Sequence, residues 1–210
     1  MIISKEHIIP VYGGAVWSQI IYTEATQSQV PLLFLHGGPG GNHLKLKWGC
    51  STMAKHFPLI FYDQLGGGKS YLPQEQLQNS NLWQIQRFVA ELKAVIEFYQ
   101  LQEFNLCGTS WGAALALEYL FTTANPKIKH LILSSPLVSA TMWMEDANYL
   151  KQQLPDDVQQ TILECEQRGN TNSKEYQSAV NCFYDRYVLC KKLLSEEQLD
   201  IINSRSEEHT

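Results

Sequence analysis

Four uninterrupted apolar runs are spaced along the first two thirds of the chain, and each stops at a loop of glycine or serine. They are found in PLLFLHGG, PLIFYDQLGG, EFNLCGTS and IKHLILSS. Apolar runs of this length without alternation are typical of strands covered on both faces of a sheet. Residues 8–23 alternate instead around Gly13 and Gly14, which predicts a hairpin of two short strands.

Helical periodicity lies between these runs. Residues 83–100 place apolar side chains on one stripe, and residues 111–124 repeat the pattern with Ala, Leu and Tyr. Strands that alternate with helices predict an α/β fold with a mostly parallel, doubly wound sheet, here preceded by the hairpin. Ligands of such sheets bind beyond the carboxyl ends of the strands, where all the glycine-rich loops lie.

The pattern changes after about residue 139. No further buried-strand run follows, and residues 142–203 predict amphipathic helices broken at Pro155 and at RGNTNS. We therefore expect a sheet-bearing core in residues 1–140 and a partial helical cap in residues 141–204.

Composition narrows the classes of function. The 210 residues are 44% hydrophobic and carry a net charge of −5 with scattered lysines and arginines, so we expect no nucleic-acid partner. No apolar run approaches the roughly 18 residues of a membrane helix, and the opening MIISKEH is unlike a signal peptide. We expect no membrane association and a cytoplasmic location. Five cysteines without a C-x-x-C pair indicate neither a zinc site nor a disulfide framework.

The segment CGTSWGAALALEY contains the pattern G-x-S-x-G at residues 108–112. An apolar strand precedes the pattern and a helix follows it, which is the context that the motif requires. Glycine neighbours permit a tight, strained turn with the serine hydroxyl exposed at its tip. Ser110 is therefore the candidate nucleophile.

The loop LHGGPGG, residues 35–41, ends an earlier strand. Glycine lets backbone N–H groups approach a developing negative charge, so we expect an oxyanion hole made by the N–H groups of Gly38 and Trp111. Pro39 has no N–H and stiffens the loop. The phosphate-loop patterns G-x-x-x-x-G-K-[ST] and G-x-G-x-x-G are both missing. The candidate substrate-binding residues of this loop are His36, Gly37 and Pro39.

A third loop, FYDQLGGGKS, superficially resembles a phosphate loop. Its spacing does not fit, because Asp63 stands where the first glycine of that pattern is needed. We interpret Asp63 and Gln64 as turn residues that hydrogen-bond to neighbouring backbone and brace the pocket wall.

Together these loops resemble those of the proline iminopeptidase (prolyl aminopeptidase) family of α/β-hydrolase serine peptidases. The likeness covers residues 5–203, and AVNCFYDRYVLC is similar to the cap helix of these enzymes. Leu65 and Lys69 stand where family members often have arginine, so a specificity broader than proline stays open. The residues that carry the resemblance are His36-Gly37-Gly38-Pro39-Gly40, Asp63-Gln64-x-Gly66-x-Gly68-x-Ser70 and Gly108-x-Ser110-Trp111-Gly112.

The resemblance implies an α/β-hydrolase fold and acyl transfer on a small peptide or on an amino-acid amide or ester. Ser110 would attack the carbonyl of the first peptide bond, Gly38 and Trp111 would hold the oxyanion, and water would release the acyl-enzyme. No metal or organic cofactor is implied. Two alternatives stay open: an esterase or carbon-carbon hydrolase on the same fold, and a non-catalytic binding module.

The acid and the base of a catalytic triad are not found in this chain. In this fold they follow the serine, the acid first and the histidine last. His130 opens a strand and so lies at the amino end of the sheet, away from Ser110 at the carboxyl end. His209 has no strand before it. The expected last strands are missing from the pattern, and we expect an inactive fragment. The acid is missing because the aspartates that could supply it lie in the cap-like region rather than after a core strand. These are Asp146, Asp156, Asp157, Asp185 and Asp200.

The last six residues, RSEEHT at 205–210, resemble one translated frame of a widely used sequencing adapter. We expect a non-native tail on a C-terminally truncated chain. The strand HLILSS would then present an unpaired apolar edge and lower the solubility of the protein.

Overall fold

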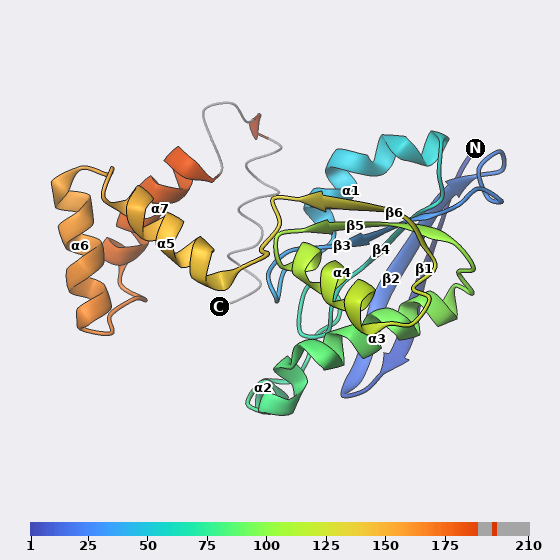
Figure 1. Ribbon diagram of the computed structural model, residues 1–210, viewed down its shortest axis with the longest axis horizontal. Helices are drawn as coiled ribbons and strands as arrows, with labels where there is room; N and C mark the ends of the chain where they lie inside the picture. The colour runs from blue at the N-terminus through green and yellow to red at the C-terminus, as the bar shows by residue number, and fades with distance from the viewer. Residues whose placement is uncertain (189–194, 197–210) are drawn as a thin grey trace. The chain divides into compact units, whose positions relative to one another are not determined.

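Six strands form one mixed sheet in the part of the chain that the structure, a computed structural model, describes: residues 1–188 and 195–196. The strand order is β1-β2-β4-β3-β5-β6 (Figure 1). β3 is parallel to β4 and β5, and β6 is parallel to β5, whereas β2 is antiparallel to β1 and β4. The predicted α/β fold is confirmed. The strands are β1 (Ile2–Val11), β2 (Gly14–Thr23), β3 (Leu32–Leu35), β4 (Leu59–Tyr62), β5 (Phe104–Thr109) and β6 (Ile128–Ser134).

The N-terminal hairpin is longer than the pattern predicted. β1 begins at Ile2 rather than near residue 8, and it pairs with β2 from Ile2 opposite Thr23 to Val11 opposite Gly14. Most side chains of β1 are exposed, and its first half, in which two isoleucines precede Ser4, Lys5 and Glu6, shows no alternation of apolar and polar residues. Backbone pairing with β2 holds this half in the sheet instead.

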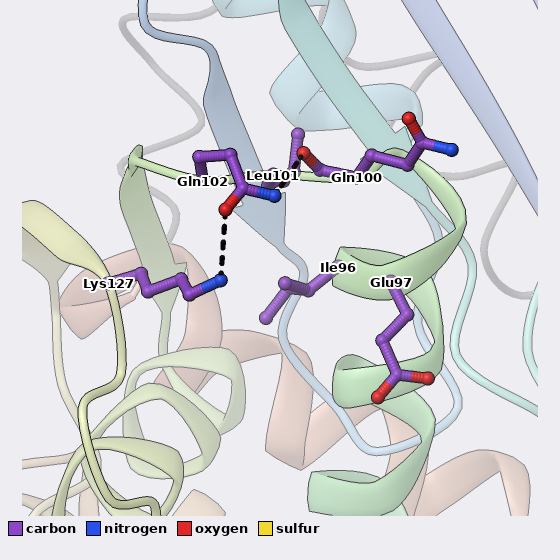
Figure 2. Close-up of a pocket in the computed structure, with 6 residues that line it drawn as sticks. All are labelled: Ile96, Glu97, Gln100, Leu101, Gln102 and Lys127. Atoms are coloured by element: carbon purple, nitrogen blue, oxygen red, sulfur yellow. Dashed lines mark hydrogen bonds between the residues drawn. The ribbon is translucent and has the colours of Figure 1, made fainter.

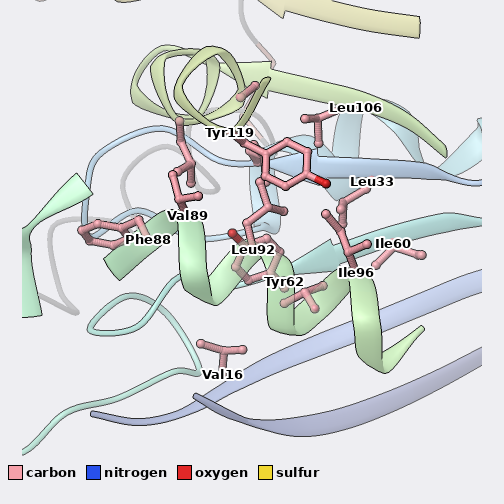
Figure 3. Close-up of a cluster of buried hydrophobic side chains, with 14 of the residues drawn as sticks. Val16, Leu33, Ile60, Tyr62, Phe88, Val89, Leu92, Ile96, Leu106 and Tyr119 are labelled. Carbon is pink, nitrogen blue, oxygen red and sulfur yellow. The ribbon is translucent and has the colours of Figure 1, made fainter. Parts of the chain in front are cut away.

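Helices cover both faces of the sheet. Because side chains alternate along a strand, Leu33 and Ile60 contribute to one apolar cluster, whereas their neighbours Phe34 and Phe61 contribute to another. The first cluster, drawn in Figure 3, lies under α3 (Ile85–Phe98) and α4 (Trp111–Thr122). Figure 1 shows these two helices on one face of the sheet. The second lies under α1 (Leu44–Cys50) and the 3₁₀ helix η1 (Ser51–Lys55), with Phe34 and Phe61 stacked at a centroid distance of 4.7 Å. Two short segments, α2 (Gln74–Leu77) and η2 (Ser80–Trp83), precede α3.

Two compact units divide the chain, Met1–Val138 and a second unit that begins at Ser139. The second unit holds α5 (Ala140–Lys151), α6 (Asp156–Gln167) and α7 (Lys174–Tyr187), with breaks at the predicted places. Ser139 and Ser173 cap α5 and α7 through their hydroxyl groups. A small core of Leu154, Ile162 and Ala179 holds this unit together. The part of the predicted cap that follows residue 188, residues 195 and 196 apart, lies outside the described residues, as do His209, Asp200, Cys190 and the tail 205–210.

The strand β6 lies at the other edge of the sheet and pairs only with β5 among the described strands. Its Ile132 and Leu133 are 45% and 36% exposed. The exposed apolar edge that the sequence predicts is thus present in the described part of the chain, and its effect on solubility stays a prediction. None of the described helices is both long and apolar enough to cross a membrane.

Candidate active site

Ser110 lies between β5 and α4, at the carboxyl end of the central parallel strands. Its backbone has φ +54° and ψ −117°, a conformation that L-residues rarely adopt, and its side chain is exposed. The backbone is held on both sides, because Ser110 N–H donates to Ser134 O at 3.0 Å and Ser110 O accepts from Leu137 N–H at 3.3 Å. A fixed main chain with an accessible hydroxyl is the geometry of a nucleophile elbow.

The two glycines of the elbow are required by close packing. A Cβ on Gly112 would lie 2.2 Å from Leu35 O of β3, and a Cβ on Gly108 would lie 2.4 Å from Gly112 O. Both distances are far inside van der Waals contact with backbone atoms. The motif therefore allows α4 to lie directly against the end of β3.

The glycine loop after β3 lies beside Ser110. A Cβ on Gly37 would be 3.3 Å from Ser110 Cβ, and Gly38 adopts φ +132° ahead of a cis bond to Pro39. Trp111 is the first residue of α4, so its N–H has no acceptor within the helix. Within the described residues, neither Gly38 N–H nor Trp111 N–H donates to a protein acceptor. Two free backbone donors thus flank the candidate nucleophile.

The His36 ring lies beneath this loop, not on its surface. His36 is only 2% exposed; its Nε2 accepts from Gln64 N–H at 2.9 Å, so Nδ1 carries the proton and donates to Gly37 O at 2.8 Å. Of the three predicted substrate-binding residues, Pro39 is exposed and Gly37 is half-buried. Both ring nitrogens of His36 are thus engaged within the protein, and the assignment of His36, Gly37 and Pro39 to substrate binding stays a prediction.

Gln64 connects the glycine loop to the elbow. Its Nε2 donates to His36 O at 3.0 Å, and its Oε1 accepts from the indole N–H of Trp111 at 3.0 Å. Gln64 is fully buried, so neither contact competes with solvent. The side chain fixes Trp111 relative to the loop that carries Gly38.

Asp63 organises the turn that follows β4. Its carboxylate accepts from His43 N–H at 2.7 Å, from His43 Nδ1–H at 2.9 Å and from Lys69 N–H at 2.9 Å. Ser70 closes the same turn, donating to Asp63 O at 2.6 Å and accepting from Trp17 N–H at 2.8 Å. The interpretation of Asp63 and Gln64 as bracing turn residues is confirmed by these hydrogen bonds.

Leu65 and Lys69, the two residues that depart from the family pattern, differ in their exposure to solvent. Leu65 is 1% exposed and belongs to the main apolar cluster. Lys69 is half exposed, with its Nζ 4.4 Å from the Trp17 ring centroid and 3.3 Å from Glu6 Oε1. A hydrogen bond from Trp17 and the nearby Lys69 hold the pKa of Glu6 below its usual value, although burial opposes them.

Sequence reasoning missed two buried pairs that support these loops. His43 is bound to Asp63, and its ring packs against that of Trp17 at a centroid distance of 4.2 Å and an interplanar angle of 34°. Arg87 and Glu91 of α3 form an ion pair, and Glu91 Oε2 accepts from Leu65 N–H at 3.2 Å. Burial raises the pKa of Glu91 to about 7, although Arg87 opposes this shift. The i, i+4 spacing of Arg87 and Glu91 was the available signal, but such pairs are usually exposed.

No histidine reaches Ser110 Oγ through a hydrogen bond in the described part of the chain. His130 is exposed near the start of β6, where its Nδ1 is 2.8 Å from Asn105 Oδ1. It thus lies toward the amino end of its strand, as predicted, whereas Ser110 lies at the carboxyl end of β5. The aspartates Asp146, Asp156, Asp157 and Asp185 lie on the helices of the second unit. No group of three or more metal-ligating side chains is gathered among the described residues.

A cavity of about 300 Å³ lies away from Ser110. Figure 2 shows Lys127 extended toward Gln102, whose Oε1 accepts from Lys127 Nζ at 3.3 Å. Gln102 and Lys127 each precede a strand, so the cavity lies at the amino ends of β5 and β6, whereas Ser110 lies at the carboxyl end of β5. Its lining residues are Ile96, Glu97, Gln100, Leu101, Gln102 and Lys127.

Comparison with known proteins agrees with this geometry. The sequence model of the alpha/beta hydrolase fold family matches residues 30–184. The proline iminopeptidase of Heyndrickxia coagulans is 39% identical over 183 residues, which cover 87% of this chain and 61% of that protein. This chain therefore spans about three fifths of the length of that relative.

Two solved structures share the fold over almost the whole chain. The crystal structure of VinJ has a TM-score of 0.83 at 26% identity, covering 98% of this chain and 70% of that one. The crystal structure of the proline iminopeptidase of Mycobacterium smegmatis has a TM-score of 0.79 at 27% identity, covering 97% of this chain and 68% of that one. The family predicted from the three loops is thus confirmed: the chain belongs to the α/β hydrolases and is similar to the proline iminopeptidases of Heyndrickxia coagulans and Lactobacillus delbrueckii.

Proposed function

We propose that the protein represents a serine aminopeptidase that removes N-terminal residues, preferably proline, from small peptides by acyl transfer. Ser110 Oγ forms a bond to the carbonyl carbon of the first peptide bond, and the amine of the following residue leaves with a proton. Water then attacks the acyl-enzyme and releases the free amino acid. The names of the curated relatives support the peptidase activity and the preference for proline.

In this proposal the oxyanion is held by the N–H groups of Gly38 and Trp111. Both donors are free of protein acceptors in the described residues. Trp111 directly follows Ser110, and the close approach of Gly37 to Ser110 brings the loop of Gly38 beside it. Backbone donors aimed at developing charge typically contribute about 3 kcal/mol each to the transition state. The single observation that carries the proposal is this meeting of the strained serine with the glycine loop.

We assign the cap role to residues 141–204, which follow the core in the predicted division of the chain. The boundary between the two compact units, after Val138, lies two residues before that division. Carboxylates of a cap would recognise the free amino group of a peptide and so restrict cleavage to its first bond. The acyl transfer proposed here uses side-chain and backbone groups alone and calls for no cofactor.

The 210-residue polypeptide itself is proposed to be inactive, because its described residues bring no base to Ser110. Loss of the base of a serine triad lowers kcat by about 10⁶. We expect this polypeptide to hydrolyse prolyl p-nitroanilide slower by about that factor than the Heyndrickxia coagulans proline iminopeptidase assayed beside it. A rate within about tenfold of that enzyme contradicts the proposed inactivity.

A binding experiment tests the proposed function without turnover. The boronic acid analogue of proline imitates the acyl-transfer transition state, because a serine Oγ adds to its boron to give a tetrahedral adduct. The hydroxyl proton of the serine is released to the solvent in this step, so the adduct can form without a triad base. We expect calorimetry to show that the chain binds this compound, that Ser110→Ala loses the binding, and that the N-acetylated compound binds more weakly. Equal binding of both compounds indicates an esterase, and binding unaffected by Ser110→Ala indicates a non-catalytic module. Either outcome refutes the proposed function.

A further inference from the structure

The turn that carries Gln64 is anchored from α3. Glu91 Oε2 accepts from Leu65 N–H at 3.2 Å and from Arg87 Nη1. The side chains of Arg87 and Glu91 are only 5% and 1% exposed. A buried carboxylate is therefore attached to the backbone of the residue that follows Gln64.

The same helix also reaches Trp111 directly. Phe88 packs edge-on against the Trp111 ring with centroids 5.5 Å apart, and the Arg87 guanidinium carbon lies 3.8 Å from the Phe88 ring centroid. Gln64, next to the anchored Leu65, accepts from the Trp111 indole N–H at 3.0 Å. Two short routes thus lead from the Arg87–Glu91 pair to Trp111, one through the turn and one through Phe88.

We propose that Glu91 is a positioning residue that acts through Leu65 and Gln64 to fix Trp111 and its backbone N–H. The ionised carboxylate holds Leu65 N–H and Arg87, and the turn in consequence presents Gln64 Oε1 to the indole. The part of this inference that concerns catalysis rests on the proposed function, which assigns the Trp111 N–H to the oxyanion. The contact itself does not depend on that assignment.

Few groups compensate for a change in the charge of Glu91. Among the described residues, the titratable and charged groups that face it are Arg87 from its own helix and Tyr62 from β4, and the turn contributes the Leu65 N–H. In the described residues Glu91 Oε1, Tyr62 Oη and Arg87 Nε are buried without a hydrogen-bond partner. Protonation of Glu91 removes the charge that strengthens its hydrogen bond with the Leu65 N–H, and so weakens its hold on the turn. Because burial raises the pKa of Glu91 to about 7, this change falls in an accessible pH range.

Nuclear magnetic resonance on the isotopically labelled 210-residue chain tests the proposal. Between about pH 5.5 and pH 8.5 the Glu91 carboxyl carbon should titrate with a midpoint near 7, and the indole and backbone N–H signals of Trp111 should shift with the same midpoint. Glu91→Gln should abolish the Trp111 transition. Glu97→Gln, at an exposed position of the same helix, should retain it.

A Trp111 transition that persists in Glu91→Gln overturns the proposal, because it would then report His36 or another group. Trp111 signals that do not move with the Glu91 carbon overturn it as well. Should Glu91→Gln fail to fold, agreement or disagreement of the two midpoints in the unmodified chain decides the matter. A purely stabilising role would lower the melting temperature in the variant without a titration at Trp111. Failure of boronate binding would refute the proposed function and leave this titration intact.

Discussion

Replacing Gly112 by alanine should destabilise the protein strongly, because α4 lies against the backbone of β3. The added Cβ would be 2.2 Å from Leu35 O and 2.6 Å from His36 O. Ordinary contact begins near 3.4 Å, so the start of α4 must move by about 1.2 Å from β3. The neighbouring atoms are backbone carbonyls of a buried strand and its loop, which cannot rotate out of the way.

We expect Gly112→Ala to lower the free energy of unfolding by about 3 kcal/mol, the upper end of the usual cost of overpacking. Urea denaturation followed by circular dichroism measures this loss. With a slope of about 2 kcal/mol per molar urea, the midpoint falls by about 1.5 M. The displacement of α4 also moves Trp111, so binding of the prolyl boronic acid should weaken in the same variant.

Gly49→Ala is the matched control. Gly49 lies in α1, and no atom is within 4 Å of the position that its Cβ would take. Alanine at an exposed helix position is more favourable than glycine by about 0.5 to 1 kcal/mol, so this variant should be slightly more stable than the parent protein. A Gly112→Ala midpoint within about 0.2 M of the parent protein would refute the packing argument, because a shift of about 1.5 M is expected.

Three further substitutions test other parts of the account. Ser110→Gly should raise the free energy of unfolding by about 1 kcal/mol, because glycine relieves the backbone strain at φ +54°. Ser110→Ala keeps the Cβ and should leave this free energy unchanged, so equal melting temperatures for the two variants would contradict the assigned strain. Asp63→Asn should lower the free energy of unfolding by about 2 to 3 kcal/mol, because two backbone N–H groups and the His43 ring lose a charged acceptor. Asp146→Asn, at an exposed position, is the control and should stay within about 0.5 kcal/mol of the parent protein. The pH dependence of stability reports Glu91: its pKa is higher in the folded protein than its usual 4.5, so its contribution is fully present below about pH 4.5 and is lost as the pH rises through about 7. The difference in unfolding free energy between the parent protein and Glu91→Gln should therefore decline by about 3 kcal/mol between those pH values, and a flat or rising difference would contradict the assigned pKa.

The parts of the fold nearest the site were predictable because their signals are local. Strand, glycine turn and helix follow one another within 20 residues around Ser110, and the turn requires small residues whatever packs around it. The same holds for the loop of Gly38, where φ is +132°. Because such turns require glycine or another small residue, the residue types alone indicate where they occur.

Contacts between distant segments could not be predicted in this way. Ser4 to His7 of β1 are polar and read as irregular, yet backbone pairing with β2 places them in the sheet. Glu91 reads as a surface residue of an amphipathic helix, yet the turn at Leu65 covers it. The direction of the His36 ring is likewise decided by a distant residue, because its Nε2 accepts from the N–H of Gln64, 28 residues later. Burial of a polar group depends on tertiary partners, which periodicity does not reveal.

Whether Ser110 is a nucleophile beside an oxyanion hole can be decided by boron-11 nuclear magnetic resonance of the complex with prolyl boronic acid. We expect a tetrahedral boron signal in the presence of the 210-residue chain and only the trigonal signal of the free compound with Ser110→Ala. A trigonal signal with the parent protein, or a tetrahedral signal that persists in Ser110→Ala, would contradict it.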